Sequence, residues 1–246
     1  MRHIIGRFAK SLLGTITNVH TTEPVVALTF DDGPDPEWTP RLLAIMQRHN
    51  ALGTFFMIGA QAAQHPDVVA RVESGGHAIG NHTWDHPSFP LVSSRERFKQ
   101  LRRCSRVLGS SVGRMFRPPY GAQNARSRLD LAIVGFSVVT WNVAPGDWLD
   151  HDAGTIAADL AKNVYPGSII LLHDRLSDAL KPEYFNRQPT LDAVELLLQE
   201  MTGRFRFVTV PQLLQFGPAR RVFWSQLPDR AFLDQLKNRE GVVRSY

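Results

Sequence analysis

Cysteine is nearly absent from the 246-residue sequence, which contains only Cys104. A single cysteine excludes an internal disulfide framework and a zinc site built from CxxC pairs. Long apolar runs are also missing, because Arg2, His3, Arg7 and Lys10 interrupt the apolar residues near the N-terminus. We therefore expect no transmembrane span and no export signal, and we predict a cytoplasmic protein.

Basic residues slightly outnumber acidic ones, and they are not clustered on one predicted element. Lysine and arginine number 28 against 23 acidic residues, and the basic residues are scattered, so nucleic acid is not a predicted partner. Apolar residues recur at helical spacing between Met1 and His20, which indicates an amphipathic, basic extension over residues 1–24. Two interpretations stay open for it: packing on the main domain, or peripheral contact with an anionic membrane surface.

Beyond Pro24, strand-like and helix-like segments alternate. The predicted strands are Val25–Phe30, Ala51–Ile58, His77–Gly80, Met115–Arg117, Phe136–Trp141, Ser168–Leu172 and Phe205–Thr209. The predicted helices are Thr39–His49, Pro66–Ser74, Ser93–Leu108, Ala125–Val134, Ala153–Asn163 and Thr190–Met201. This alternation predicts a single α/β domain folded as a closed or nearly closed βα barrel. An open doubly wound sheet is the alternative, but no GxGxxG follows the first strand.

Charged or imidazole side chains follow the predicted strands where each one ends. They are Asp31, His82, Arg117, Asp147 and His173. The carboxyl ends of the strands in a βα barrel share one rim, where active sites are built. We expect these side chains to meet there.

Asp31 and Asp32 end the apolar run Val25–Phe30. Along a regular strand they would point to opposite faces, so they can share a site only if the chain turns, and Gly33-Pro34 supplies a turn. A solvated turn is the alternative interpretation. Two buried like charges are costly without a cation, so the pair predicts a metal site.

His82 and His86 follow a later strand. Pro87 disfavours a helical conformation at His86, so a tight loop is predicted. Two imidazoles and one carboxylate suit zinc or a similar divalent ion and leave coordination positions open. One of the two aspartates then remains as a base. His77 lies within a predicted strand, and we interpret it as structural.

Arg117 precedes Pro118-Pro119, which hold the arginine and the Tyr120 amide in rigid positions. A guanidinium can orient a catalytic carboxylate, and Asp147 is a candidate for the outer partner of Arg117. A surface salt bridge is the alternative for this pair. His173 ends a buried run, and histidine can donate a proton near neutral pH, which suits a general acid.

In these residues the chain resembles the NodB-homology polysaccharide deacetylases of carbohydrate esterase family 4, from about Val25 to Leu214. The motifs occur in the family's order: Thr29-Phe30-Asp31-Asp32-Gly33, Asn81-His82-Thr83-Trp84-Asp85-His86, Arg117-Pro118-Pro119-Tyr120, Asp147-Trp148 and Leu171-Leu172-His173. The resemblance implies a distorted (β/α)7 barrel over residues 25–215. We expect the basic tail over 216–246 to pack on this barrel. One departure is Ala144, where the family often has an acidic or hydroxyl residue.

The resemblance also implies roles for these residues. The metal ligands are Asp32, His82 and His86, with zinc expected and cobalt or another divalent ion as alternatives. Asp31 is the implied general base and His173 the general acid. Arg117 is expected to orient Asp31, with Asp147 behind it. The implied substrate contacts are the Tyr120 backbone N–H at the oxyanion, and Trp148 with Leu171 around the acetyl methyl group.

The implied reaction is hydrolysis of an N-acetyl group on an amino sugar, releasing acetate and a free amine. The expected partner is an N-acetylated carbohydrate, a biosynthetic intermediate rather than cell-wall peptidoglycan if the protein stays in the cytoplasm. Three alternatives stay open: hydrolysis of an acetyl ester, deformylation or deacylation of a lipid-linked or small-molecule amino sugar, and a non-catalytic glycan-binding barrel. The non-catalytic barrel predicts that a catalytic or ligand residue of a motif is replaced, and none of them is replaced here.

Overall fold

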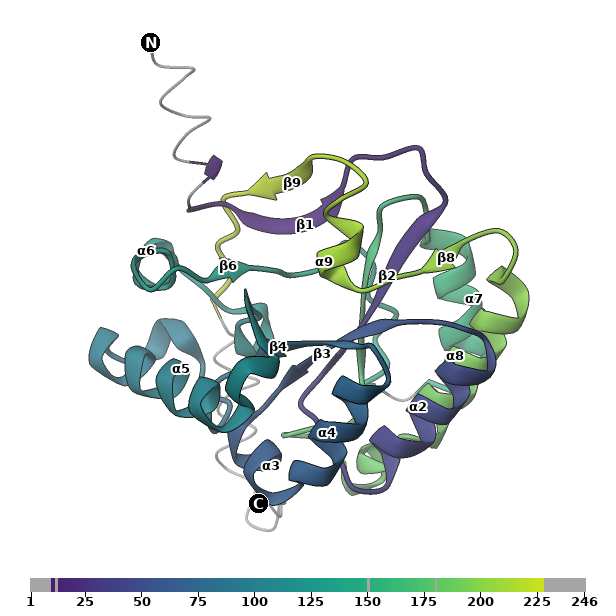
Figure 1. Ribbon diagram of the computed structural model, residues 1–246, viewed down its shortest axis with the longest axis horizontal. Helices are drawn as coiled ribbons and strands as arrows, with labels where there is room; N and C mark the ends of the chain where they lie inside the picture. The colour runs from purple at the N-terminus through teal and green to yellow at the C-terminus, as the bar shows by residue number, and fades with distance from the viewer. Residues whose placement is uncertain (1–9, 12, 150, 180, 228–246) are drawn as a thin grey trace.

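The computed structural model describes residues 10–11, 13–149, 151–179 and 181–227. Its centre is a parallel sheet with the strand order β6-β5-β4-β3-β2-β7 (Figure 1). The bounds are β2 Val25–Asp31, β3 Gly53–Met57, β4 Ala78–Asn81, β5 Val112–Phe116, β6 Ser137–Val138 and β7 Ile169–His173. A further strand, β8 (Arg206–Phe207), pairs with the start of β2. Each predicted strand is therefore confirmed, with ends that differ by a few residues.

The sheet curls until its two edges approach one another. Val143, which follows β6 in the chain, forms an isolated β-bridge with Ile170 of β7. Ile16 forms another isolated β-bridge, with Val139. The result is the distorted barrel that the sequence predicted. Its carboxyl-end rim therefore collects the segments that follow the strands.

Helices cover the outside of the curled sheet (Figure 1). The predicted ones are α2 Trp38–Arg48, α4 Pro66–Ser74, α5 Ser94–Leu108, α6 Ala125–Ile133, α7 Ala153–Asn163 and α8 Gln188–Met201. Short elements that the sequence pattern did not predict are α3 Gly59–Gln64, α9 Val210–Leu213, η1 Phe89–Leu91, η2 Gly109–Ser111, η3 Pro119–Gly121 and η4 Pro182–Phe185. Elements of three to six residues contain too few turns to show helical periodicity.

Strand β2 separates two apolar clusters, and alternate residues face each of them. Val26, Leu28 and Phe30 pack with the surrounding helices. Val25 and Ala27 pack inside the barrel with Phe56, Met115 and Ile169. Because successive strand residues point to opposite faces, Thr29 and Asp31 continue the interior face. The same alternation places Leu171 and His173 of β7 on that face, with Ile169.

The N-terminal prediction is wrong for Thr15–Val19. These residues form a buried strand, β1, which pairs antiparallel with β9 (Ala219–Val222), whereas the helix seen in the described part of this segment is limited to Lys10, Ser11 and Leu13. Threonine, isoleucine and valine favour strands, and the partner strand lies about 200 residues further along the chain, where local periodicity cannot show it. Residues 1–9, which carry much of the predicted amphipathic pattern, lie outside the described residues.

The C-terminal tail packs on the barrel through the part that is described. β9 lies beside β1 (Figure 1), and Gln226 pairs with Gln123 further along. The sequence also predicts a short amphipathic helix in this tail from the apolar residues Phe232, Leu233 and Leu236, which lie outside the described residues. Within the described ranges, no helix is both long and apolar enough to span a membrane.

Candidate active site

Asp31 and Asp32 reach one cleft because the backbone turns at Asp32. β2 ends at Asp31, and Asp32 has a φ of 72°, in the left-handed region. The prediction that the chain must turn here is confirmed, although the turn begins at Asp32 itself rather than at Gly33. Both carboxylates are buried, with about 4% of each residue exposed.

Arg117 holds Asp31, as predicted. Its Nη1 donates to Asp31 Oδ1 at 2.8 Å and to Thr29 Oγ1 at 2.7 Å. Its Nη2 and Nε donate to the carbonyl oxygens of Thr140 and Val139 at 3.0 and 3.2 Å. The guanidinium is fully buried, so these contacts fix it in place and leave Asp31 Oδ2 directed toward the histidines, 4.0 Å from His82 Nε2.

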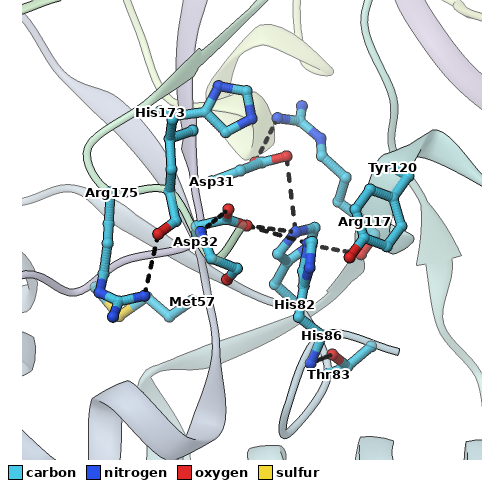
Figure 2. A network of polar contacts seen from close by, with 12 residues as sticks. Asp31, Asp32, Met57, His82, Thr83, His86, Arg117, Tyr120, His173 and Arg175 are labelled. Carbon is cyan, nitrogen blue, oxygen red and sulfur yellow. Dashed lines mark hydrogen bonds and ion pairs between the residues drawn. The ribbon is translucent and has the colours of Figure 1, made fainter. Parts of the chain in front are cut away.

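Asp32, His82 and His86 converge on one point (Figure 2). The Nε2 atoms of both histidines lie 3.2 Å from Asp32 Oδ1. His82 Nδ1 faces the Arg117 carbonyl oxygen at 2.8 Å, which requires its proton on Nδ1 and leaves the Nε2 lone pair directed at Asp32. The loop that carries the histidines is not helical, as Pro87 predicted.

The residues present fit a divalent metal ion. Asp32 Oδ2 accepts a hydrogen bond from the Ser177 amide at 2.8 Å, whereas Oδ1 is buried and has no hydrogen-bond partner among the described residues. Buried polar atoms are normally paired, and a carboxylate oxygen facing two imidazole nitrogens is a site suited to a cation. One oxygen and two nitrogen ligands would leave further positions open.

Asp178 is a site residue that sequence reasoning missed. Its Oδ2 lies 3.6 Å from His86 Nδ1 and accepts a hydrogen bond from the Tyr120 hydroxyl at 2.6 Å. Burial lowers the pKa of His86, but the charges of Asp32 and Asp178 raise it to about 10. This strong negative potential favours a cation. An aspartate in a loop carries no local signal that distinguishes it from a solvated one.

His173 is held by Asp147. The distance from His173 Nδ1 to Asp147 Oδ1 is 2.9 Å, and the His173 amide donates to Asp147 Oδ2 at 2.9 Å. Burial disfavours the imidazolium, but the charge and hydrogen bond of Asp147 outweigh it and raise the pKa of His173 above its usual value. His173 is therefore equipped to carry a proton near neutral pH.

The predicted partnership of Asp147 with Arg117 is wrong. Asp147 pairs with Arg187 instead, whose Nη2 lies 2.6 Å from Asp147 Oδ2. Burial raises the pKa of Asp147, but the charges of His173 and Arg187 lower it by more. The net result is a pKa below the usual value of an aspartate. The physical reason is that the donors of Arg117 already bind Asp31, Thr29 and two carbonyl oxygens. Sequence reasoning missed Arg187, which lies 40 residues after its partner.

A cavity of about 320 Å³ opens above these groups. Asp31 and His173 line it beside Asp32, His82 and His86, and Trp148 with Leu171 forms part of its apolar wall. Tyr120, also in the lining, has a φ of 58°. Arg117 and Asp147 lie behind the lining residues, where they contact Asp31 and His173 respectively. In Figure 2, Asp31 lies between the ring of His173 and the pair His82 and His86.

The fold and the cleft together define a class: a βα-barrel protein with a candidate Asp-His-His metal site, beside which an aspartate and a histidine are each held by a separate charged partner. The family model for polysaccharide deacetylases matches residues 18–139. A peptidoglycan-N-acetylglucosamine deacetylase of Bacillus cereus is 36% identical over 201 residues, which cover 80% of this chain and 70% of that protein. The chain belongs to the polysaccharide deacetylase family.

Two further similarities cover most of the chain. A chitooligosaccharide deacetylase of Azorhizobium caulinodans is 36% identical over 168 residues, which cover 67% of this chain and 80% of that protein. A crystal structure of a peptidoglycan N-acetylglucosamine deacetylase, in complex with 4-naphthalen-1-yl-N-oxidanyl-benzamide, superposes with a TM-score of 0.75 at 33% identity. That match covers 83% of this chain and 94% of the other.

Proposed function

We propose that this enzyme removes acetyl groups from N-acetylglucosamine residues of a glycan and uses zinc. One observation carries the proposal: Asp31 and His173 are direct neighbours in the β2–β7 register and line one cavity with Asp32, His82 and His86. A base and an acid beside a metal-binding triad are the groups that hydrolysis of an amide needs. The chitooligosaccharide and peptidoglycan deacetylases among the relatives support an N-acetylated amino sugar as substrate.

In the proposed reaction, a bound zinc ion would supply Lewis acidity at the acetyl carbonyl. Asp31 takes a proton from the attacking water while Arg117 keeps its other oxygen engaged. The new C–O bond leaves negative charge on the carbonyl oxygen, to which the Tyr120 backbone N–H donates. His173 then gives its proton to the nitrogen as the C–N bond breaks, so acetate and a free amine leave.

The acyl group that we propose is acetyl rather than formyl. Trp148 and Leu171 line the cavity next to His173, and the Trp148 ring centre lies 5.4 Å from that of His173. These apolar side chains offer a small hydrophobic surface that a methyl group would cover and a formyl hydrogen would not. The donor set of two imidazoles and one carboxylate supports zinc.

Acetate and formate release would test the function. Protein stripped with a chelator and resupplied with zinc should release acetate from N-acetylglucosamine oligomers, and little formate from N-formyl sugars. Asp31→Asn keeps the shape of the side chain but removes the base, and we expect the rate to fall by about 10² to 10⁴. Formate in excess of acetate would contradict the choice of acyl group. Zinc-loaded protein that releases neither product would contradict the function.

Two further proposals come from the sequence and concern where the protein resides: a cytoplasmic location, and peripheral contact with a membrane surface. The cytoplasmic location is tested by fractionating cells that express the full chain, with soluble and membrane markers followed in parallel. Recovery with the membrane fraction that salt reverses would instead support peripheral contact through the basic residues of the N-terminal extension.

A further inference from the structure

We propose that residues 223–227, which follow β9, form one wall of the substrate cleft, and that Gln226 binds a polar group of the amino sugar through its carboxamide. This inference rests on the proposed glycan substrate. It assigns a binding role to a segment that lies outside the residues matched by the family model, which end at residue 139.

The segment is tied to the barrel by main-chain and tryptophan contacts. The Gln226 amide donates to the Gln123 carbonyl oxygen at 3.1 Å, and the Gln123 amide donates back at 2.8 Å. Trp224 Nε1 donates to the Gly121 carbonyl oxygen at 3.0 Å, and Arg128 donates to the carbonyl oxygen of Trp224. None of these contacts uses the side chain of Gln226, so the segment stays in place when that side chain is changed.

The Gln226 side chain lies over the loop that follows Tyr120. It lines the same cavity as Asp31 and His173. A methyl group added at Gly121 would lie 3.4 Å from Gln226 Oε1 and 2.9 Å from the Trp141 ring. Gly121 also has a φ of 63°, so both its conformation and its lack of a side chain let the C-terminal segment close against this loop.

The carboxamide is available for a ligand. Among the described residues, it makes no hydrogen bond, and Gln226 is exposed. A carboxamide offers two donors and one acceptor, which match a sugar hydroxyl or an acetamido group. An oriented polar group in an otherwise apolar wall is how small-molecule sites fix the pose of a ligand.

The same segment also sets an aromatic surface beside Gln226. Trp141 lines the cavity, and the Trp224 ring packs against it with 5.9 Å between centres and an angle of 64°. A sugar ring presents an apolar C–H face and a polar edge. Trp141 suits the face and Gln226 suits the edge, so both features of one sugar unit are matched within one wall.

The test compares Gln226→Leu with Gln215→Leu. Leucine keeps the bulk but removes the amide, and Gln215 is an exposed glutamine that does not line this cavity. With N-acetylglucosamine oligomers, Gln226→Leu should raise KM about threefold to tenfold, the effect of losing about 1 kcal/mol of hydrogen bonding. kcat and the melting temperature should match those of Gln215→Leu. In an Asp31→Asn background, the dissociation constant of the oligomer should rise by the same factor.

The outcomes separate this inference from the proposed function. If the unmodified enzyme releases acetate and Gln226→Leu behaves as Gln215→Leu does, the inference is wrong and the function stands. Loss of kcat at an unchanged KM would also overturn it. If the unmodified enzyme releases no acetate, the proposed function fails instead. Should Gln226→Leu fold poorly, Gln226→Ala provides the same comparison with less added apolar surface.

Discussion

Asp31 and His173 are neighbours, yet each is held by a different partner of opposite charge. Arg117 binds the aspartate, and Asp147 binds the histidine. Five non-glycine residues in the described chain have positive φ, and four of them belong to the cleft or its loops: Asp32, Thr83, His86 and Tyr120. Such conformations cost energy and persist where surrounding contacts enforce them, which is typical of functional sites.

The partnership of His173 with Asp147 predicts a specific pH dependence. The charge of Asp147 raises the pKa of His173, so the imidazolium persists to higher pH than in an ordinary histidine. Asp147→Asn keeps a hydrogen-bond acceptor but removes the charge, which lowers the pKa of His173 and deprotonates the acid earlier. We expect the alkaline limb of the kcat/KM profile to move to lower pH.

The control for this prediction is Asp192→Asn, which removes the same charge from an exposed position on α8. Its alkaline limb should coincide with that of the unmodified enzyme. An alkaline limb that stays unmoved in Asp147→Asn would mean that His173 is not the group titrating there. Melting temperatures of both variants separate a loss of folded protein from a change in the pH profile.

Strands position the site through their alternation. In β2 and β7, residues on the interior face run from apolar side chains at the start to Asp31 and His173 at the end. The neighbouring strands β3 and β4 are linked at their starts by His77. Its Nδ1 accepts a hydrogen bond from the Gly53 amide at 3.1 Å, and its ring packs edge-on against Phe55. The interpretation of His77 as structural is confirmed.

This contact predicts an acid-sensitive contribution to stability. Burial lowers the pKa of His77 to about 4, from an ordinary value of 6.5. Between these values the unfolded chain binds a proton that the folded chain does not, so stability is full above pH 6.5 and falls as pH drops toward 4. The slope from this residue is at most about 1.4 kcal/mol per pH unit.

Denaturant unfolding at several pH values would measure this contribution. His77→Asn keeps an acceptor near the Gly53 amide but cannot titrate, so its free energy of unfolding should depend less steeply on pH over this window. His49→Asn, at the end of α2, serves as the comparison. Equal slopes for His77→Asn and the unmodified protein would contradict the assignment.

Curling of the sheet brings together segments that are far apart in the chain. The candidate metal ligands Asp32, His82 and His86 come from the end of β2 and the loop after β4, so an ion bound there would tie these two segments together. Anything that binds only the folded state stabilises it. Zinc at a hundredfold excess over its dissociation constant should add about 2.7 kcal/mol, or about 5–10 °C in the melting temperature of a chain of this size.

Asp32→Asn should remove most of this gain. The substitution takes away the negative charge that faces both imidazoles, while the side chain can still accept a hydrogen bond from the Ser177 amide. Thermal unfolding of chelator-treated protein, with and without zinc, measures the effect. An equal rise in the variant would show that zinc stabilises the protein at another place.

The sequence by itself determined the alternation of strands and helices, and the residues that meet at the rim. Both depend on local patterns: apolar strands buried on two faces, and polar side chains where those strands end. The partner of Asp147, the role of Asp178 and the pairing of β1 with β9 were decided only by the tertiary structure. Each depends on groups far apart in the chain that come together when the sheet curls. Local periodicity does not predict such long-range contacts.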